Sequence, residues 1–332
     1  MNQQVLTTMD AAALSFVQAQ AYRVNTQVLA QVYPQWAFNE LLFVETEGNP
    51  WAAGVITYMT DYSGKAKFLS GFGKDMPFAD VSQDFMTRTF HLAGIGYQYN
   101  IEEVNTVLNV VGGTLPSRRA AAARQIYQKT MWDITLFGDT EKNFHGLTNY
   151  AGVPAAAAEA DGTGSVPYWV NASGALVKTS AQIVRDFNIA LAGVSSATFG
   201  QILANKVFLP EAAYLAIAGT PYSPVSATDT ILSFIQRNNL YTLKTGRPLD
   251  IRSLRELNDA ATSSGVEGDG RMVAYYDDPS MVKLHLPMAH QFLPVHQDGW
   301  ANFVIPGIFR TGGVEFLAPT TAYYLDGISE AS

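Results

Sequence analysis

One long helical pattern between Pro116 and Gly138 constrains the fold of this chain more than any other feature. Apolar residues recur in it at steps of three and four, which is the spacing of one face of an α-helix. Proline is tolerated in the first helical turn, and glycine suits the left-handed position after the last one. At ~1.5 Å per residue the helix is roughly 30 Å long, which is enough to form the backbone of a domain. The predicted apolar stripe consists of Ala120, Ala123, Tyr127, Met131 (or Thr130), Ile134 and Phe137.

The segments after this helix fall into a helix-rich run and then a strand-rich run. Residues 151–180 are rich in Ala, Gly, Ser and Pro, so we expect a loop and a domain border there. Helices and strands in separate runs are typical of an α+β fold. We expect a helix at 180–193, a short strand at 206–209, strand-turn-helix pieces at 211–218 and 227–238, and strands at 272–276, 282–286, 303–308, 313–317 and 321–325.

Residues 1–50 have the pattern of an N-terminal arm. Asp10 can cap a helix that starts there, and the helix should end at Tyr33, because the residue before a proline avoids the helical region. This helix either packs on the core of its own chain or reaches partly onto a neighbouring subunit. The sequence leaves both interpretations open. The apolar stripe of the arm is Leu14, Val17, Ala21, Val24 and Val28.

Residues 55–69 predict a β-hairpin. The segment 55–62 is rich in Val, Ile, Thr and Tyr, residues 61–64 form a turn signal, and 65–69 would be the returning strand. A two-stranded hairpin is marginally stable by itself, and this one has few large aliphatic side chains to bury. It therefore either folds onto its own domain or reaches over a neighbouring subunit.

Charged residues make up 15% of the chain, against roughly 25% in an ordinary soluble domain. A membrane does not explain this, because the best apolar segment, 197–219, is interrupted by Lys206, Pro210 and Glu211 and lacks the ~20 apolar residues that a span needs. The start of the chain also lacks the basic and apolar regions of a signal peptide, so we expect synthesis in the cytosol. Such a chain is expected to cover much of its surface with partners, as an assembly subunit does.

Several classes of site are disfavoured. A net charge of −8 argues against a nucleic-acid reader, and the lack of cysteine excludes disulfides and thiolate metal sites. His285, His290 and His296 are close in sequence, but their uneven spacing and the intervening prolines favour structural or interface roles over a metal site. We predict no catalytic, cofactor-binding or metal site, and therefore no enzyme.

Arg118, Arg119 and Arg124 lie near the start of the predicted long helix, where cations oppose the helix dipole. They are either solvated or paired with carboxylates of another subunit. Surface ion pairs are common and weak, which gives the first interpretation the larger weight. Together with hairpin residues they form our candidate inter-subunit contacts: Arg118, Arg119, Arg124, Tyr62, Lys65, Lys67 and Phe68.

The order of the segments resembles that of a known family. A strand leads into Tyr97-Gln98-Tyr99-Asn100-Ile101-Glu102-Glu103, the long helix follows, and Gly146-Leu147-Thr148-Asn149 comes after it. The strand-like segments 271–275 and 306–313 lie near the end of the chain. In this order they resemble the major capsid proteins of tailed bacteriophages, which have the Hong Kong-type capsid fold. The resemblance covers roughly residues 10–330.

This resemblance implies an α+β phage capsid fold in named parts. They are an N-terminal arm (1–50), an extended β-hairpin called the E-loop (51–82), a P domain built on a long spine helix (83–165, with the helix at about 116–137), an A domain (166–285), and closing strands shared by the P and A domains (286–332).

The resemblance also implies a function. The chain would be a structural protein that self-assembles as pentamers and hexamers into the icosahedral head enclosing phage dsDNA, with assembly in the host cytoplasm. Implied partners are many copies of itself, scaffolding and portal proteins, and in some relatives decoration proteins. Packaged DNA would be contacted weakly and non-specifically, which suits a shell in which DNA must slide. No cofactor and no membrane are implied.

Other interpretations of the sequence stay open at this point. An encapsulin-like shell around a protein cargo would have the same sequence texture, and a metal-dependent enzyme is the least favoured alternative. Some relatives carry a long N-terminal scaffolding region that is cleaved off. This sequence has no such region, so we expect either a separate scaffolding protein or a mature form of the chain.

Overall fold

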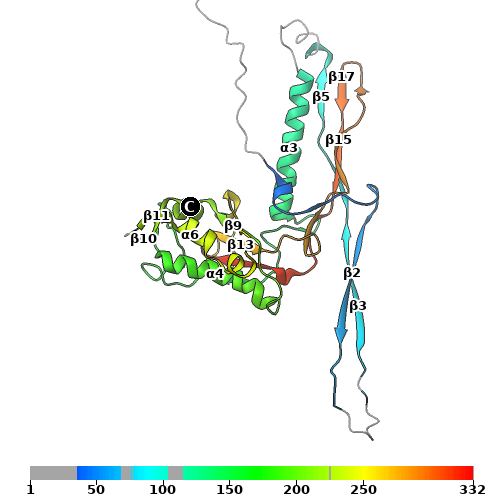
Figure 1. The fold of residues 1–332 in the computed structure, drawn as a ribbon. Helices are drawn as coiled ribbons and strands as arrows, with labels where there is room; N and C mark the ends of the chain where they lie inside the picture. Colours follow the sequence, from blue (N-terminus) through cyan, green and yellow to red (C-terminus); the bar gives the residue numbers. More distant parts are fainter. Residues whose placement is uncertain (1–35, 69–75, 77, 104–114, 224–225, 332) are drawn as a thin grey trace, which may run out of the picture. The chain divides into compact units, whose positions relative to one another are not determined.

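The computed structural model describes residues 36–68, 76, 78–103, 115–223 and 226–331. The helix expected between Asp10 and Tyr33 lies outside these residues. Figure 1 shows the fold along the sequence. Within the described ranges, every helix is too short or too polar to span a bilayer.

The long helix is confirmed as α3, Leu115–Phe137. Gly138 follows it with a φ of +73°, the left-handed conformation that glycine adopts at low cost. Its buried face runs through Ala123, Tyr127 and Met131, as expected, but then shifts by one residue to Leu136. Phe137, expected on the stripe, is exposed, because an ideal helix drifts relative to a strict repeat of three and four residues.

A five-stranded sheet, called here the central sheet, forms from segments far apart in the chain. Its strand order is β12-β9-β13-β20-β8. Three neighbours, β9, β13 and β20, pair antiparallel to one another, whereas β12 and β8 pair parallel at the two edges. The strands are β8 (Ala155–Ala157), β9 (Lys206–Pro210), β12 (Asp250–Leu254), β13 (Arg271–Tyr275) and β20 (Ala322–Asp326).

Helices cover one face of the central sheet. The main one is α4, Ser180–Ala197, whose N-terminus is closed by a capping box between Thr179 and Gln182. Buried residues of the helices join alternate residues of β9 and β13, such as Val207 and Met272, in a first core. The other helices of this region are α5 (Glu211–Gly219), α6 (Ile231–Arg237) and α7 (Leu240–Thr245).

A second core lies on the opposite face of the central sheet. Phe208 and Tyr275, the alternate residues of β9 and β13, pack in it together with Met131 and Leu136 of α3. The strands of a second five-stranded sheet also contribute to this core. Its order is β1 (Val44–Glu45), β14 (Val282–His285), β19 (Gly313–Phe316), β7 (Phe144–His145) and β6 (Gly138–Asp139).

Two three-stranded sheets lie near α3 (Figure 1). The strand expected at 303–308 is in fact two strands, because Pro306 lacks the N–H that a continuous ladder requires. The chain leaves one sheet before this proline and enters the other after it. The sheets are β15 (Met288–Phe292), β18 (Gly307–Thr311) and β4 (His91–Gly94), and β16 (His296–Asp298), β17 (Asn302–Ile305) and β5 (Tyr97–Asn100).

The hairpin is present, but its second strand was predicted in the wrong place. Strand β2, Gly54–Ser63, pairs antiparallel with β3, Asp80–Thr89, from Gly54–Thr89 to Ser63–Asp80. The returning strand therefore does not lie at residues 65–68, residue 69 lies outside the described residues, and the paired region continues beyond residue 82. The turn signal at 61–64 misled the prediction, because β3 is polar and lacks a clear apolar alternation.

The other helices and strands expected after the long helix are present with small differences, but β8 (Ala155–Ala157) lies in the segment 151–180 that was expected to be a loop. The helix expected at 180–193 extends to Ala197, the strands at 272–276, 282–286, 313–317 and 321–325 are β13, β14, β19 and β20, and the α+β class holds. The piece at 211–218 is entirely helical, as α5, and the piece at 227–238 is a strand followed by α6. Short elements complete the described fold: η1 (Phe38–Glu40), β10 (Pro221–Ser223), β11 (Ser226–Thr230), η2 (Arg255–Leu257) and η3 (Pro319–Thr321).

Candidate inter-subunit surfaces

The segment Gly146-Leu147-Thr148-Asn149 closes the C-terminal end of α3. The last carbonyls of a helix lack partners within the helix, and this segment supplies them. Leu147 N–H donates to Thr135 O, Thr148 donates to Leu136 O through both its N–H and its hydroxyl, and Asn149 Nδ2 donates to Phe137 O at 2.7 Å.

Gly146 is required by the same close approach. A Cβ on this residue would lie 2.0 Å from Leu136 O, well inside van der Waals contact. Asn149 Oδ1 also accepts from Gly146 N–H at 2.9 Å, so the side chain bridges the helix end and the loop. The motif therefore fixes the direction in which the chain leaves the long helix.

The hairpin exposes large apolar side chains on both strands. Tyr58 and Phe85 are cross-strand partners, and both are exposed, as are Tyr62 and its partner Val81. Phe78, near the far end, is 84% exposed. A two-stranded ribbon cannot bury such side chains within itself. Exposed apolar groups that are grouped in this way mark interaction surfaces.

The predicted contact residues of the hairpin all lie towards its far end. Tyr62, Lys65 and Phe78 border a cavity of 380 Å³ between the ends of the two strands. Lys67 and Phe68 are exposed just beyond it. The structure thus places Tyr62, Lys65, Lys67 and Phe68 on one exposed segment at the far end of the hairpin.

The three arginines of α3 have different surroundings. Arg119 forms a bidentate ion pair with Glu103 of its own chain, at 3.0 Å for both contacts, and also donates to Gln98 O. The hydrogen bonds from Arg119 lower the pKa of Glu103 below its ordinary value. The guanidinium of Arg124 lies 5.7 Å from the ring centre of Phe292. Arg118 is exposed and has no ion-pair partner among the described residues. Contact of all three with another subunit stays a prediction.

The three histidines do not converge. His290 stacks on Tyr127 of α3 at 5.0 Å, and its Nε2 lies 3.0 Å from Ile95 O. His296 is exposed on β16. His285 is buried between Glu45 and Glu315. Over the residues that the structure describes, no three His, Asp or Glu side chains are arranged to hold a metal ion.

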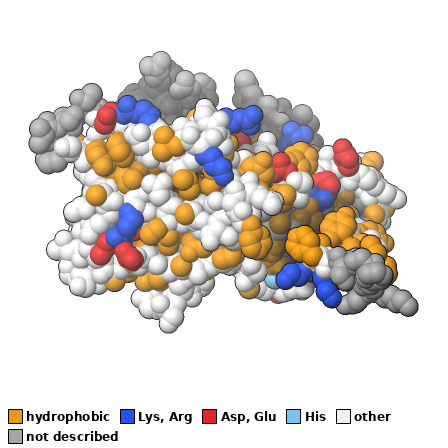
Figure 2. All heavy atoms as spheres, turned by 60° about the horizontal axis from the view of Figure 1, so that its bottom comes forward, with side chains coloured by type: hydrophobic (Ala, Val, Ile, Leu, Met, Phe, Trp, Pro, Cys, Tyr) orange, Lys and Arg blue, Asp and Glu red, His pale blue; other side chains and the backbone are white. Residues whose placement is uncertain are grey.

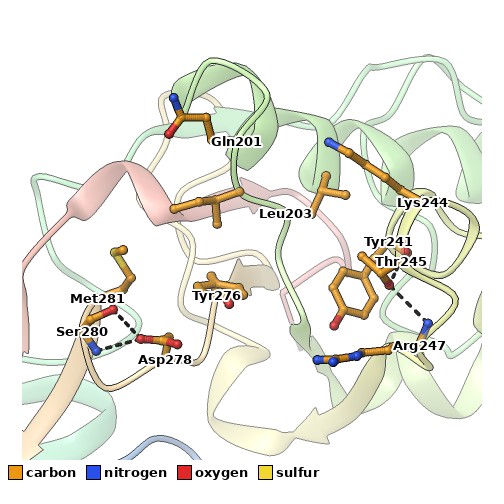
Figure 3. A pocket seen from close by; sticks show the side chains of 11 residues that line it. Gln201, Leu203, Tyr241, Lys244, Thr245, Arg247, Tyr276, Asp278, Ser280 and Met281 are labelled. Carbon is orange, nitrogen blue, oxygen red and sulfur yellow. Dashed lines mark hydrogen bonds between the residues drawn. The ribbon is translucent and has the colours of Figure 1, made fainter.

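A pocket of 580 Å³ lies between α7 and the loop after β13 (Figure 3). Arg247 and Asp278 line opposite sides of it, and the ring of Tyr276 lies between them (Figure 3). Hydrogen bonds from the hydroxyl and the N–H of Ser280 lower the pKa of Asp278. Its carboxyl group is therefore ionised, which suits polar contact with another molecule better than proton transfer.

Sequence reasoning missed other exposed apolar groups. Figure 2 shows apolar side chains spread over one face of the molecule among few charged ones. Phe199 is 94% exposed and has a φ of +52°, a conformation that is rare for a bulky residue. Trp300 is 86% exposed in the turn between β16 and β17. Asp298-Gly299 before Trp300 was a usable turn signal, whereas nothing in the local sequence singled out Phe199.

A family model described as major capsid protein matches residues 64–328. The chain belongs to this family. The resemblance drawn from the order of segments is thereby confirmed. A comparison of this capsid protein with curated protein sequences gives no match.

Solved structures of phage capsids share the fold of this capsid protein. The capsid of Myoviridae phage XM1 is 15% identical, with a TM-score of 0.75 over 93% of this chain and 98% of that one. The Microbacterium phage Oxtober96 structure is 12% identical, with a TM-score of 0.59 over 95% and 98%. The capsid of a native GTA particle is 9% identical, with a TM-score of 0.57 over 94% and 95%. At these identities the likeness shows the fold alone, which is the Hong Kong-type capsid fold.

Membership of this family settles the class of function. The family consists of structural shell proteins and not of enzymes. This capsid protein therefore builds the shell of a virion from many copies of itself. The encapsulin-like alternative is less favoured, because the family and the matched structures named above are those of capsids.

Proposed function

We propose that this capsid protein assembles as pentamers and hexamers into the icosahedral head of a tailed phage, around dsDNA. The observation that carries the proposal is the β2–β3 hairpin, whose aromatic side chains are exposed in the isolated chain. A copy of the same protein is the natural cover for them, because a shell subunit meets many identical neighbours. Heterologous contacts of this kind generate closed rings when the rotation between neighbouring copies closes.

The proposal assigns the parts of the chain as the family resemblance implies. Residues 1–50 act as the arm, 51–82 as the E-loop, whose second strand continues to Thr89, 83–165 as the P domain with α3 as spine helix, 166–285 as the A domain, and 286–332 as shared closing strands. The two cores support this division, since the first draws mainly on residues between 158 and 274 and the second on α3 and strands from both ends.

The proposed partners follow from the charge balance and the class of function. An acidic shell with a net charge of −8 would contact packaged DNA weakly. Assembly in the host cytoplasm would involve scaffolding and portal proteins, and decoration proteins could bind the finished head. Arg118, Arg119, Arg124, Tyr62, Lys65, Lys67 and Phe68 are the proposed inter-subunit contacts.

Electron microscopy of the purified full-length chain tests this proposal. We expect rings with five- and six-fold symmetry, or closed shells. A matched pair of variants then tests the role of the hairpin. In the first, residues 59–84 are replaced by Asn-Gly, which joins Tyr58 to its cross-strand partner Phe85 through a tight turn. In the second, Asp61→Asn and Asp84→Asn keep the hairpin at full length.

The shortened variant should unfold cooperatively yet form no shells, whereas the matched variant should still assemble. Only monomers at every concentration and salt for the wild type would contradict the assembly proposal. Normal shells from the shortened variant would contradict the role of the hairpin alone. A protein cargo bound on the inner face of purified shells would favour the compartment instead.

A further inference from the structure

A buried histidine lies between two glutamates where β1, β14 and β19 run side by side. His285 is 2% exposed, and the side chain of Glu315 is fully buried. His285 Nδ1 lies 2.7 Å from Glu45 Oε2, and His285 Nε2 lies 2.8 Å from Glu315 Oε2. Glu45 and His285 are register partners in the parallel β1–β14 pair, so the backbone holds them in place.

This geometry sets the number of protons on the imidazole. Ionised carboxylates only accept hydrogen bonds, and a neutral imidazole has a single N–H to donate. Both short contacts can be hydrogen bonds only when His285 carries a proton on each nitrogen. The two nitrogens point to different carboxylates, so the three side chains cannot converge on one metal ion.

Other charged groups lie beside the imidazole of His285. Lys283 Nζ lies 3.1 Å from Glu45 Oε1, and Glu47 borders the same cavity of 150 Å³ as His285. Burial by itself would raise the pKa of Glu315, but the hydrogen bond and charge of His285, with the charges of Lys283 and Arg88, hold that pKa below its ordinary value. Among the described residues, the ion-pair partner of the buried Glu315 carboxylate is His285, so this carboxylate loses that partner when the imidazole is neutral. Arg88 also faces His145 of β7.

The cluster contacts both strands of the hairpin at its base. On β2, Thr57 Oγ1 lies 3.5 Å from Glu315 Oε1. On β3, Arg88 is the register partner of Val55. The ring of Phe90, which follows β3, lies 5.7 Å from the imidazole of His285. The segment from Glu45 to Thr57 and the end of β3 are therefore held through the same buried charges.

We propose that Glu45, His285 and Glu315 form a protonation-dependent clasp that fixes the base of the β2–β3 hairpin. When His285 loses one proton, a buried carboxylate faces a nitrogen lone pair, and burying an unpaired charge is costly. Protonation of the carboxylates in acid removes the attraction from the other side. The hairpin base is then held firmly only over an intermediate range of pH. This inference does not depend on how copies of the chain assemble.

Hydrogen exchange of the full-length protein, followed by mass spectrometry from pH 5 to pH 9, tests the clasp. Rates are corrected for intrinsic exchange, with peptides from α4 as the internal reference. In the wild type, peptides covering 43–57 and 86–92 should exchange about tenfold faster at the alkaline end, the effect of losing one buried charged hydrogen bond. Equal protection of these peptides at every pH would overturn the proposal.

Glu315→Gln is the decisive variant. A neutral His285 can donate to Glu45 and accept from the new amide N–H, so the second proton is no longer needed. The alkaline increase in exchange should therefore disappear. If Glu315→Gln keeps the full alkaline increase, the clasp is refuted. His285→Gln should give fast exchange at every pH, and His296→Gln, on the exposed strand β16, should behave as the wild type. If His285→Gln fails to fold, the Glu315→Gln result decides.

Discussion

Arg271 and Asp326 are register partners on the neighbouring strands β13 and β20 and form a buried bidentate ion pair. Arg271 Nε lies 2.6 Å from Asp326 Oδ1, and Nη2 lies 2.8 Å from Oδ2. The guanidinium also donates to Thr148 O, in the segment after α3, and packs 4.6 Å from the ring centre of Tyr324. One side chain therefore joins the central sheet to the end of the long helix.

Breaking this ion pair should be strongly destabilising. Asp326→Asn leaves the guanidinium of Arg271 buried without a counter-charge, so we expect a loss of ~3–5 kcal/mol in the free energy of unfolding. Urea denaturation measures it. Arg271→Met should cost a similar amount, and the double variant should cost less than the sum of the two. Strict additivity would show that the two residues act independently.

Acid should destabilise the folded protein in part by protonating the carboxyl group of Asp326. Burial opposes ionisation of Asp326, but hydrogen bonds and charge from Arg271, together with hydrogen bonds from the Ser263 segment, lower its pKa in the folded state. The stabilisation is then complete above the unfolded pKa of ~3.9 and is lost as the pH falls through the lower folded value.

The measurement for this prediction is urea unfolding at pH 5 and at pH 2.5. The difference in free energy of unfolding between wild type and Asp326→Asn should shrink at the lower pH. This comparison separates Asp326 from other carboxyl groups such as Asp161, whose pKa is lowered to about 2 by the hydrogen bond from Arg185. A constant difference would contradict the assignment.

The closure of α3 should depend on Asn149. Asn149→Ala removes the hydrogen bonds to Phe137 O and from Gly146 N–H, so we expect a loss of ~1–3 kcal/mol. Thermal and urea unfolding give the value. Gln128→Ala, on the exposed side of the same helix, should change stability by no more than ~0.5 kcal/mol. Equal effects of the two substitutions would mean that the loop does not close the helix.

We expect substitutions of Arg119 and Arg118 in α3 to have different effects. Arg119→Gln removes a pair within the chain, so it should raise the pKa of Glu103 towards its ordinary value and weaken association less than Arg118→Gln does. Arg118→Gln should leave unfolding unchanged but weaken association between copies and make it less sensitive to salt. Sedimentation at several salt concentrations compares them. If Arg118→Gln leaves association untouched, this residue is solvated.

The sequence predicted α3 well because its signals are local. Pro116 and Gly138 bound the helix, and the apolar spacing lies between them. Only the first strand of the hairpin was predicted correctly. The strand that pairs with β2 begins after residue 79, carries Asp80, Gln83 and Asp84, and has little apolar pattern. Local turn chemistry at 61–64 was outweighed by pairing over a longer distance.

The buried charge pairs could not be predicted from the sequence. Arg271 and Asp326 are 55 residues apart, and Glu45 is 238 residues from Lys283. Neither pair has a motif, because the contact exists only after the strands have been arranged. Histidine spacing argued against a metal site, but it could not show that His285 would meet two carboxylates from other strands.

Each inner strand of the central sheet contributes side chains to both cores. Val207 of β9 is buried on one side, and its neighbour Phe208 on the other. Neither core can unfold while the other stays folded, because the loss of a shared strand removes side chains from both cores. We therefore expect calorimetry of the isolated chain to show one heat-absorption peak for these regions. We therefore also expect the layers on either side of β9 and β13 to respond to mechanical load as a single body.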